Sequence, residues 1–140
     1  MSRILTYFLL IPTIGFAQSA KFKLTDTDIY EGQYIVTNEI RFDFMKWSLT
    51  KSEFLDSLTT FLQERPIEKV EIFRMEFIQP EYSAHLHMRR ARAIEEYLVN
   101  KGISRERLTV DGETELINEN THGDGKQNKT FTKITIVSTN

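Results

Sequence analysis

Apolar and polar residues repeat along this chain with two different periods, and each period indicates one kind of secondary structure. The segment from Gln33 to Phe44 has apolar residues at alternate positions near its end, at Ile40, Phe42 and Phe44. This pattern is typical of a half-buried strand or of two short strands. A capping box, Thr50-Lys51-Ser52-Glu53, follows and predicts the start of a helix. This helix has one apolar face and ends before Pro66; the face consists of Phe54, Leu55, Leu58, Phe61 and Leu62.

A second strand is predicted from Lys69 to Phe77, and its apolar pattern changes phase in the middle. It begins with Val70 and Ile72 on one parity and ends with Phe73, Met75 and Phe77 on the other. We expect the second set to lie in the core. The alternative is an exposed apolar patch that binds a partner protein.

The rest of the chain predicts one long helix and two further strands. The helix extends from Pro80, a residue suited to a first helical turn, to Lys101, and Gly102 ends it. A third strand begins at Leu108–Val110, a polar loop follows, and the last strand covers Thr130–Val137. The order β-α-β-α-β-β predicts an α/β (α+β) two-layer sandwich, a mixed sheet covered by two helices.

The first residues have the pattern of a secretory signal peptide. Arg3 precedes a short apolar run that contains Pro12 and closes with small residues. The run, about 13 residues long, is shorter than the roughly 20 that a membrane-spanning helix needs. We expect cleavage after Ala17, with Ser19 as the alternative, so that 1–17 is the signal peptide, 18–34 an N-terminal extension and 35–140 the folded domain. An N-terminal anchor helix is the other interpretation.

Composition supports one globular domain and excludes several classes of site. The 140 residues are 40% hydrophobic and 27% charged, enough for one compact core. A net charge of −2 gives no positive field that would attract nucleic acid or an acidic membrane. The chain has no cysteine, which excludes disulfides, thiolate metal sites and a lipidated cysteine.

The second half of the chain resembles a known family. Arg90-Ala91-Arg92-Ala93-Ile94 is followed by Tyr97-Leu98, Gly102-Ile103, Arg107-Leu108 and Gly112. This spacing, together with Ile40-Arg41-Phe42-Asp43-Phe44 in the first strand, resembles the OmpA-like C-terminal domain, from about Ile35 to Val137. The resemblance implies an OmpA-like fold for 35–140 and binding of peptidoglycan.

The ligand motif of that family is different here. Members carry Gly-His-Thr-Asp at the end of the second strand, and its Asp, with the Arg of the Arg-Ala pair, binds the diaminopimelate of the peptidoglycan stem peptide. At the family's spacing these positions are Ile72-Phe73-Arg74-Met75, so Met75 replaces the Asp. A slip of one residue would offer Glu76 instead. The family's Tyr-Asn at the start of the second helix is Tyr82-Ser83, and its late Asn-Arg-Arg is near Phe131-Thr132-Lys133. The resemblance therefore implies Arg90, Glu76 and Ser83 as ligand-binding residues, with binding weakened.

Arg90 stands out without reference to any family. It shares a helical stripe with apolar and aromatic residues, so its guanidinium needs a carboxylate, carbonyl groups or a ligand anion. The candidate partners are Glu76, Asp43 and Glu113. Two interpretations stay open: recognition of a ligand carboxylate, and a structural ion pair between helix and sheet.

Other candidate chemistry is weak. His85 and His87 are two residues apart and point in different directions on a helix, so they predict solvated side chains and no metal site. Trp47, which follows the first strand, is either a surface anchor or packed against the first helix. No phosphate-binding glycine loop, nucleophile elbow or zinc-protease motif is present, so we expect no enzyme activity and no cofactor.

The sequence therefore predicts a non-catalytic, exported binding module. Its expected place is the periplasm, in association with the outer membrane, and its expected partner is peptidoglycan or an envelope protein. The alternative is a degenerate OmpA-like scaffold that has lost peptidoglycan binding and mediates protein–protein interaction in the envelope. In that case the Phe73, Met75 and Phe77 strand or the Trp47 loop would bind the partner.

Overall fold

A computed structural model describes residues 20–78, 85–116 and 130–140 of the chain. Two helices and four strands follow one another in the predicted order. They are β1 (Tyr34–Thr37), α1 (Glu53–Glu64), β2 (Ile67–Ile78), α2 (Leu86–Asn100), β3 (Leu108–Leu116) and β4 (Phe131–Thr139), with the short 3₁₀ helix η2 (Arg105–Arg107) before β3. Within these residues no helix is both long enough and apolar enough to cross a membrane.

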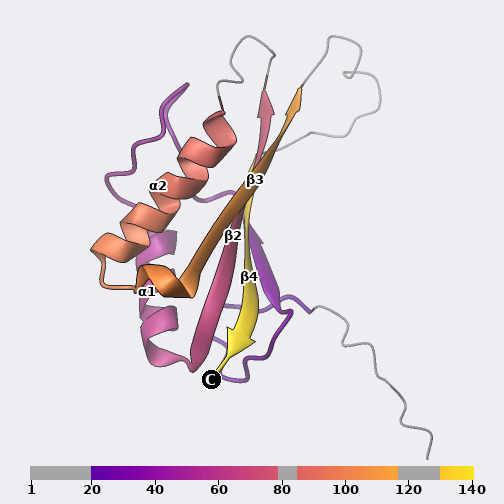
Figure 1. Cartoon of the computed structure of the whole chain (residues 1–140), viewed down its shortest axis with the longest axis vertical. Coiled ribbons are helices and arrows are strands. Elements are labelled where there is room, and N and C mark those ends of the chain that lie inside the picture. Colours follow the sequence, from indigo (N-terminus) through magenta and orange to yellow (C-terminus); the bar gives the residue numbers. More distant parts are fainter. Residues whose placement is uncertain (1–19, 79–84, 117–129) are drawn as a thin grey trace, which may run out of the picture.

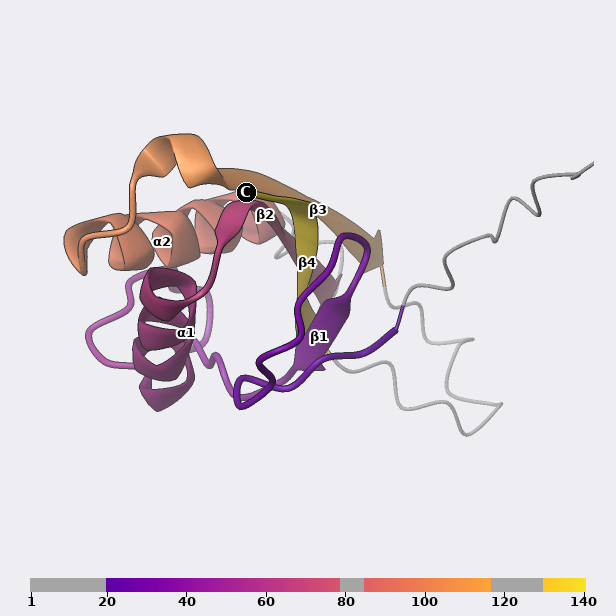
Figure 2. The ribbon, with the colours of Figure 1, turned by 90° about the horizontal axis from the view of Figure 1, so that it is seen from below.

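The four strands form one mixed sheet with the order β1-β4-β2-β3. β2 pairs with β3 in parallel and with β4 in antiparallel, and β4 also pairs with β1 in antiparallel. Both helices lie on the same side of the sheet (Figures 1 and 2). This confirms the predicted two-layer α/β sandwich, in which the parallel pair β2–β3 is connected through α2.

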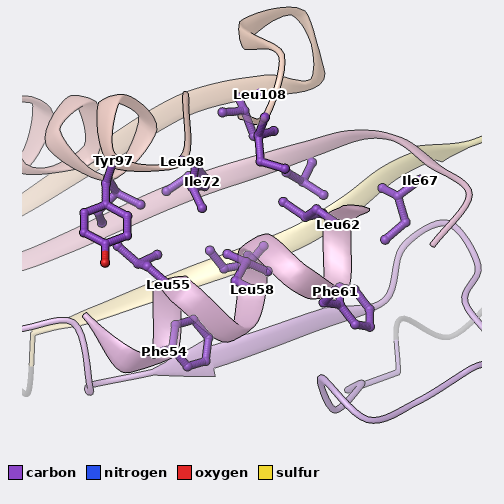
Figure 3. Packing of buried hydrophobic residues seen from close by; sticks show 14 of the residues in the cluster. Phe54, Leu55, Leu58, Phe61, Leu62, Ile67, Ile72, Tyr97, Leu98 and Leu108 are labelled. Carbon is purple, nitrogen blue, oxygen red and sulfur yellow. The ribbon is translucent and has the colours of Figure 1, made fainter. Parts of the chain in front are cut away.

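The core lies between α1, α2 and the sheet (Figure 3). Helix α1 begins within the predicted capping box, but Ser52 and not Thr50 is the N-cap, and its side chain accepts a hydrogen bond from the Leu55 amide at 3.2 Å. Its buried residues include the five predicted from the helical period. The segment before β1 adds to this core: Phe22 is buried and its ring stacks on that of Phe61 at 5.3 Å.

Helix α2 ends as predicted. Gly102 has a φ of 105°, a left-handed conformation that favours glycine, and the amide of Ile103 donates to the Leu98 carbonyl. At the other end the described helix begins at Leu86, after His85 with a φ of 53°. The predicted first turn at Pro80 lies outside the described residues, as does the predicted polar loop Asn118–Asn128.

The prediction of a strand up to Phe44 was wrong. β1 ends at Thr37, and the following residues form an irregular segment up to the start of α1. Ile40 is buried and Arg41 exposed, so the alternation is real, but no partner strand pairs with this segment. Ile40 is buried and Phe42 partly buried because the segment covers the end of the helix–sheet interface, but the alternation does not extend to Phe44, which is 73% exposed.

The predicted phase change in β2 was also wrong. Val70, Ile72, Arg74 and Glu76 all lie on the buried, helix-facing side, so the strand keeps one alternation from Val70 onward, after an irregularity at Ile67–Val70. Phe73, Met75 and Phe77 consequently lie on the opposite face, partly exposed, and not in the core. Phe73 contacts Phe131 of β4 there, with ring centroids 6.5 Å apart. The two buried charges displace the aromatic residues from the core side.

Candidate functional site

The sheet and α2 bring two predicted site residues together. Glu76 on β2 and Arg90 on α2 form an ion pair in which Nη1 of Arg90 donates to Oε2 of Glu76 at 3.0 Å. Both residues are buried, with exposed fractions of 2% for Glu76 and 8% for Arg90. Each group lies on the helix–sheet side of its element, which the alternation of β2 and the apolar stripe of α2 dictate.

A second arginine completes the cluster. Nε of Arg74 donates to the other carboxylate oxygen of Glu76 at 2.8 Å, and its Nη1 donates to Oγ1 of Thr132 and to the Ile40 carbonyl. Thr130 also donates to Glu76, at 3.3 Å. Burial lowers the pKa of the Arg74 guanidinium from its ordinary value, and the adjacent Glu76 carboxylate opposes that shift. One buried carboxylate therefore serves two buried guanidinium groups.

The irregular segment after β1 covers this cluster. Arg90 donates from Nη2 to the Asp43 carbonyl at 3.0 Å and from Nε to the Lys46 carbonyl at 2.9 Å. The Phe42 ring lies 5.0 Å from the Arg90 guanidinium carbon and 5.2 Å from that of Arg74. Each guanidinium nitrogen of Arg90 thus has an acceptor within the chain, and the segment 40–46 seals the cluster from solvent.

The predicted site residues fall in different places. Glu76 and Arg90 meet, Asp43 contributes its backbone carbonyl, and Glu113 is exposed on the outer face of the sheet. Met75 points to that outer face, away from Arg90, so Glu76 is the acidic residue beside the arginine. Ser83 and Tyr82 lie outside the described residues. A ligand that reached Arg90 would have to replace the hydrogen bonds from its guanidinium to the two carbonyl groups.

Sequence reasoning missed Arg74 as a member of the cluster. The signal was available, because Val70, Ile72, Arg74 and Glu76 have the same parity on one strand and so share a face. The role of the carbonyl groups had no such signal, since any residue supplies a carbonyl and the conformation of segment 40–46 depends on tertiary contacts.

The two histidines of the described residues belong to no metal site there. Nδ1 of His87 is 2.6 Å from Oγ1 of Thr114, and the rings of His85 and His87 are 6.3 Å apart. Among residues 20–78, 85–116 and 130–140, no cluster of three or more metal-ligating side chains is found.

Trp47 directly follows Lys46, whose carbonyl group accepts a hydrogen bond from Arg90. Its indole ring is covered by Arg89 of α2, whose guanidinium carbon lies 4.3 Å from the ring centroid. Trp47 therefore contacts the second helix through Arg89, while remaining 45% exposed.

Comparison with known proteins identifies the fold. No protein-family model matches the sequence, and no curated protein is similar to it in sequence. Among solved structures, the cell wall anchor of the T6SS from Pseudomonas aeruginosa is similar, with 18% identity, a TM-score of 0.52 and coverage of 75% of this chain and 80% of that chain. The OmpA-like domain of FopA1 from Francisella tularensis subsp. tularensis SCHU S4 is 15% identical over 76% of this chain and 75% of that chain, with a TM-score of 0.49. The chain has the OmpA-like fold, as the sequence resemblance implied.

Proposed function

We propose that this protein is a non-catalytic binding module of the cell envelope that associates with peptidoglycan through the region around Arg90 and Glu76. The observation that carries the proposal is the pair itself. An arginine and a carboxylate lie 3.0 Å apart between β2 and α2, in an OmpA-like fold. The name of the similar Pseudomonas aeruginosa protein, a cell wall anchor, supports the same function.

The two groups have the chemistry that a stem peptide requires. Diaminopimelate carries an ammonium and a carboxylate on the same carbon. A guanidinium binds a carboxylate through two parallel hydrogen bonds, and Glu76 supplies the negative charge that the ammonium requires. Ser83, in the proposed start of the second helix, would supply a polar contact.

The proposed binding is weak because Arg90 already has internal acceptors. A ligand carboxylate gains only the difference between its own hydrogen bonds and those that Arg90 makes with the Asp43 and Lys46 carbonyls. Any affinity is further reduced by the work of displacing segment 40–46 from the cluster.

The proposal includes export. The signal peptide 1–17 would direct the chain to the periplasm, where the domain would associate with the wall, close to the outer membrane. Neither a catalytic role nor a cofactor forms part of the proposal.

Sedimentation with purified insoluble peptidoglycan tests it, at low and at physiological salt. We expect the wild-type protein to pellet with the wall material. The affinity of Arg90→Ala for the wall should be lower by a factor of about 30 or more. Arg90→Lys, which keeps the charge and loses the planar fork, covers the case in which the alanine variant does not fold. Arg92→Ala is the matched control, because Arg92 is exposed on the same helix. It should pellet like the wild type.

A second candidate function is protein–protein interaction by a scaffold that has lost peptidoglycan binding. The enclosure of Arg90 by its own chain favours it, as does the partly exposed position of Phe73 and Met75 on the sheet face opposite the helices. Wild-type protein that stays in the supernatant at both salt concentrations would refute peptidoglycan association and favour this second function.

A further inference from the structure

A groove lies between residues 47–50, which follow segment 40–46, and the C-terminal half of α2. Its volume is about 460 Å³, within the range of small-molecule sites. We call it the Trp47 groove; it is lined by Trp47, Ser48, Leu49, Thr50, Ala93, Glu96, Tyr97, Asn100 and Lys101. None of the residues that the peptidoglycan proposal uses lines it.

Trp47 supplies a flat apolar surface to this groove. It is the only tryptophan of the chain, and 45% of its surface is exposed. Because the Arg89 guanidinium covers one face of the indole at 4.3 Å, the exposed surface belongs mainly to the other face and the ring edge. A half-exposed indole with one ring face covered is an aromatic platform of the kind on which a flat ligand stacks.

The charged groups of the groove are already paired. Glu96 binds Arg105 at 2.6 Å, and Nζ of Lys101 is 3.7 Å from Asp56. The groove therefore offers no unpaired charge for a charged ligand, and a neutral one fits it better.

Neutral hydrogen-bonding groups remain available beside the platform. Ser48, Thr50 and Asn100 are exposed, and no intramolecular hydrogen bond of their side chains is found in the described part of the chain. Their hydroxyl and amide groups both donate and accept, as the rim of a polyhydroxylated ring requires.

The wall that carries Trp47 is held in place by long-range contacts. Arg90 donates to the carbonyl of Lys46, the residue before Trp47, at 2.9 Å. On the far side of the groove, the Tyr97 hydroxyl accepts from the Ser52 amide and donates to Asp56 at 2.5 Å. Leu49, between these anchors, packs against the core. The groove is therefore pre-formed, which lowers the entropic cost of binding.

We propose that the Trp47 groove binds a neutral saccharide, with one apolar sugar face stacked on the indole of Trp47 and the ring hydroxyls bonded to Asn100, Ser48 and Thr50. The C–H bonds on the apolar face of a pyranose pack against an aromatic ring, while the hydroxyls around its rim satisfy the amide and hydroxyl groups. The inference rests on the proposed wall association for its biological setting, and it assigns the glycan a place apart from Arg90.

Titration with the β-1,4-linked tetramer of N-acetylglucosamine tests the inference. Because Trp47 is the only tryptophan, its fluorescence reports on the groove directly, and we expect a saturable change in emission. Asn100→Ala should weaken binding while keeping the reporter. Asn38→Ala, at an exposed position outside the groove, should titrate like the wild type.

Sedimentation with chitin beads gives a second measurement that does not depend on fluorescence. We expect the affinity of Trp47→Ala for the beads to be lower by a factor of about ten or more, the loss typical of an aromatic anchor. Circular dichroism checks that the fold of this variant is unchanged. An emission that does not change at saturating tetramer, or a Trp47→Ala variant that binds beads like the wild type, would overturn the inference.

The two proposals fail separately. If peptidoglycan sedimentation depends on Arg90 but the tetramer does not bind, the saccharide groove is wrong and wall association through Arg90 stands. If the tetramer binds through Trp47 but peptidoglycan sedimentation does not depend on Arg90, the groove stands and the assignment of Arg90 falls.

Discussion

The carboxylate of Glu76 and the guanidinium of Arg90 are joined by a hydrogen bond of 3.0 Å that connects the sheet to the second helix. Arg74 binds the same carboxylate at 2.8 Å, so one negative charge lies between two positive ones in a buried position. Removing one member of such a cluster leaves the others without compensation, which is far more costly than losing an exposed ion pair.

Glu76→Gln should therefore lower the free energy of unfolding by about 3–5 kcal/mol. The amide has the same shape as the carboxylate but leaves two buried guanidinium groups without a counter-charge. Urea denaturation monitored by circular dichroism measures the change. Glu113→Gln, an exposed acid on β3, is the control and should change the free energy by less than about 0.5 kcal/mol. Equal effects of the two variants would show that the cluster does not stabilise the fold.

Ser52→Ala should destabilise the protein by about 1 kcal/mol, because the Ser52 side chain caps the first helix through the Leu55 amide. Ser57→Ala is the matched control, since Ser57 is exposed within the same helix and alanine favours a helix interior. Thermal unfolding of both variants gives the comparison. A loss of stability in Ser57→Ala as large as that in Ser52→Ala would contradict the assigned cap.

Gly112→Ala should destabilise the domain by about 1–3 kcal/mol, the usual cost of overpacking. A Cβ atom at Gly112 would lie 2.6 Å from the Arg74 carbonyl oxygen and 3.2 Å from the His87 ring, so β3 would have to move from β2 or α2. Glu113→Ala tests whether the position in the strand alone matters, and should leave the melting temperature nearly unchanged. A Gly112→Ala variant as stable as the wild type would show that β3 shifts without cost.

The periodicity of the sequence was sufficient to predict the order and layers of the fold. The apolar face of α1 depends on local spacing and is found in the structure, whereas the helix is capped by Ser52 and not by Thr50, the first residue of the predicted capping box. The segment after Thr37 was predicted wrongly because alternation of buried and exposed residues does not require a strand. Ile40 is buried and Phe42 partly buried by covering the arginine cluster, a tertiary effect that no local pattern records.

The pairing of Glu76 with Arg90 was within reach of sequence reasoning, but the enclosure of the pair was not. Parity along β2 places Arg74 and Glu76 on the buried side once Val70 and Ile72 are taken as core residues. The hydrophobicity of Phe73 and Met75 favoured the opposite choice. The charged residues occupy the helix side because each finds a partner there, and pairing of this kind outweighs intrinsic hydrophobicity.

The hydrogen bonds from Arg90 to the Asp43 and Lys46 carbonyls also have a kinetic consequence. If Arg90 binds a carboxylate ligand as proposed, that ligand would compete for donors that become free only when segment 40–46 opens, so opening would precede binding. The observed association rate should then approach a plateau as ligand concentration rises, with the plateau equal to the opening rate of the segment. Stopped-flow mixing would therefore measure how often this protein uncovers its own arginine.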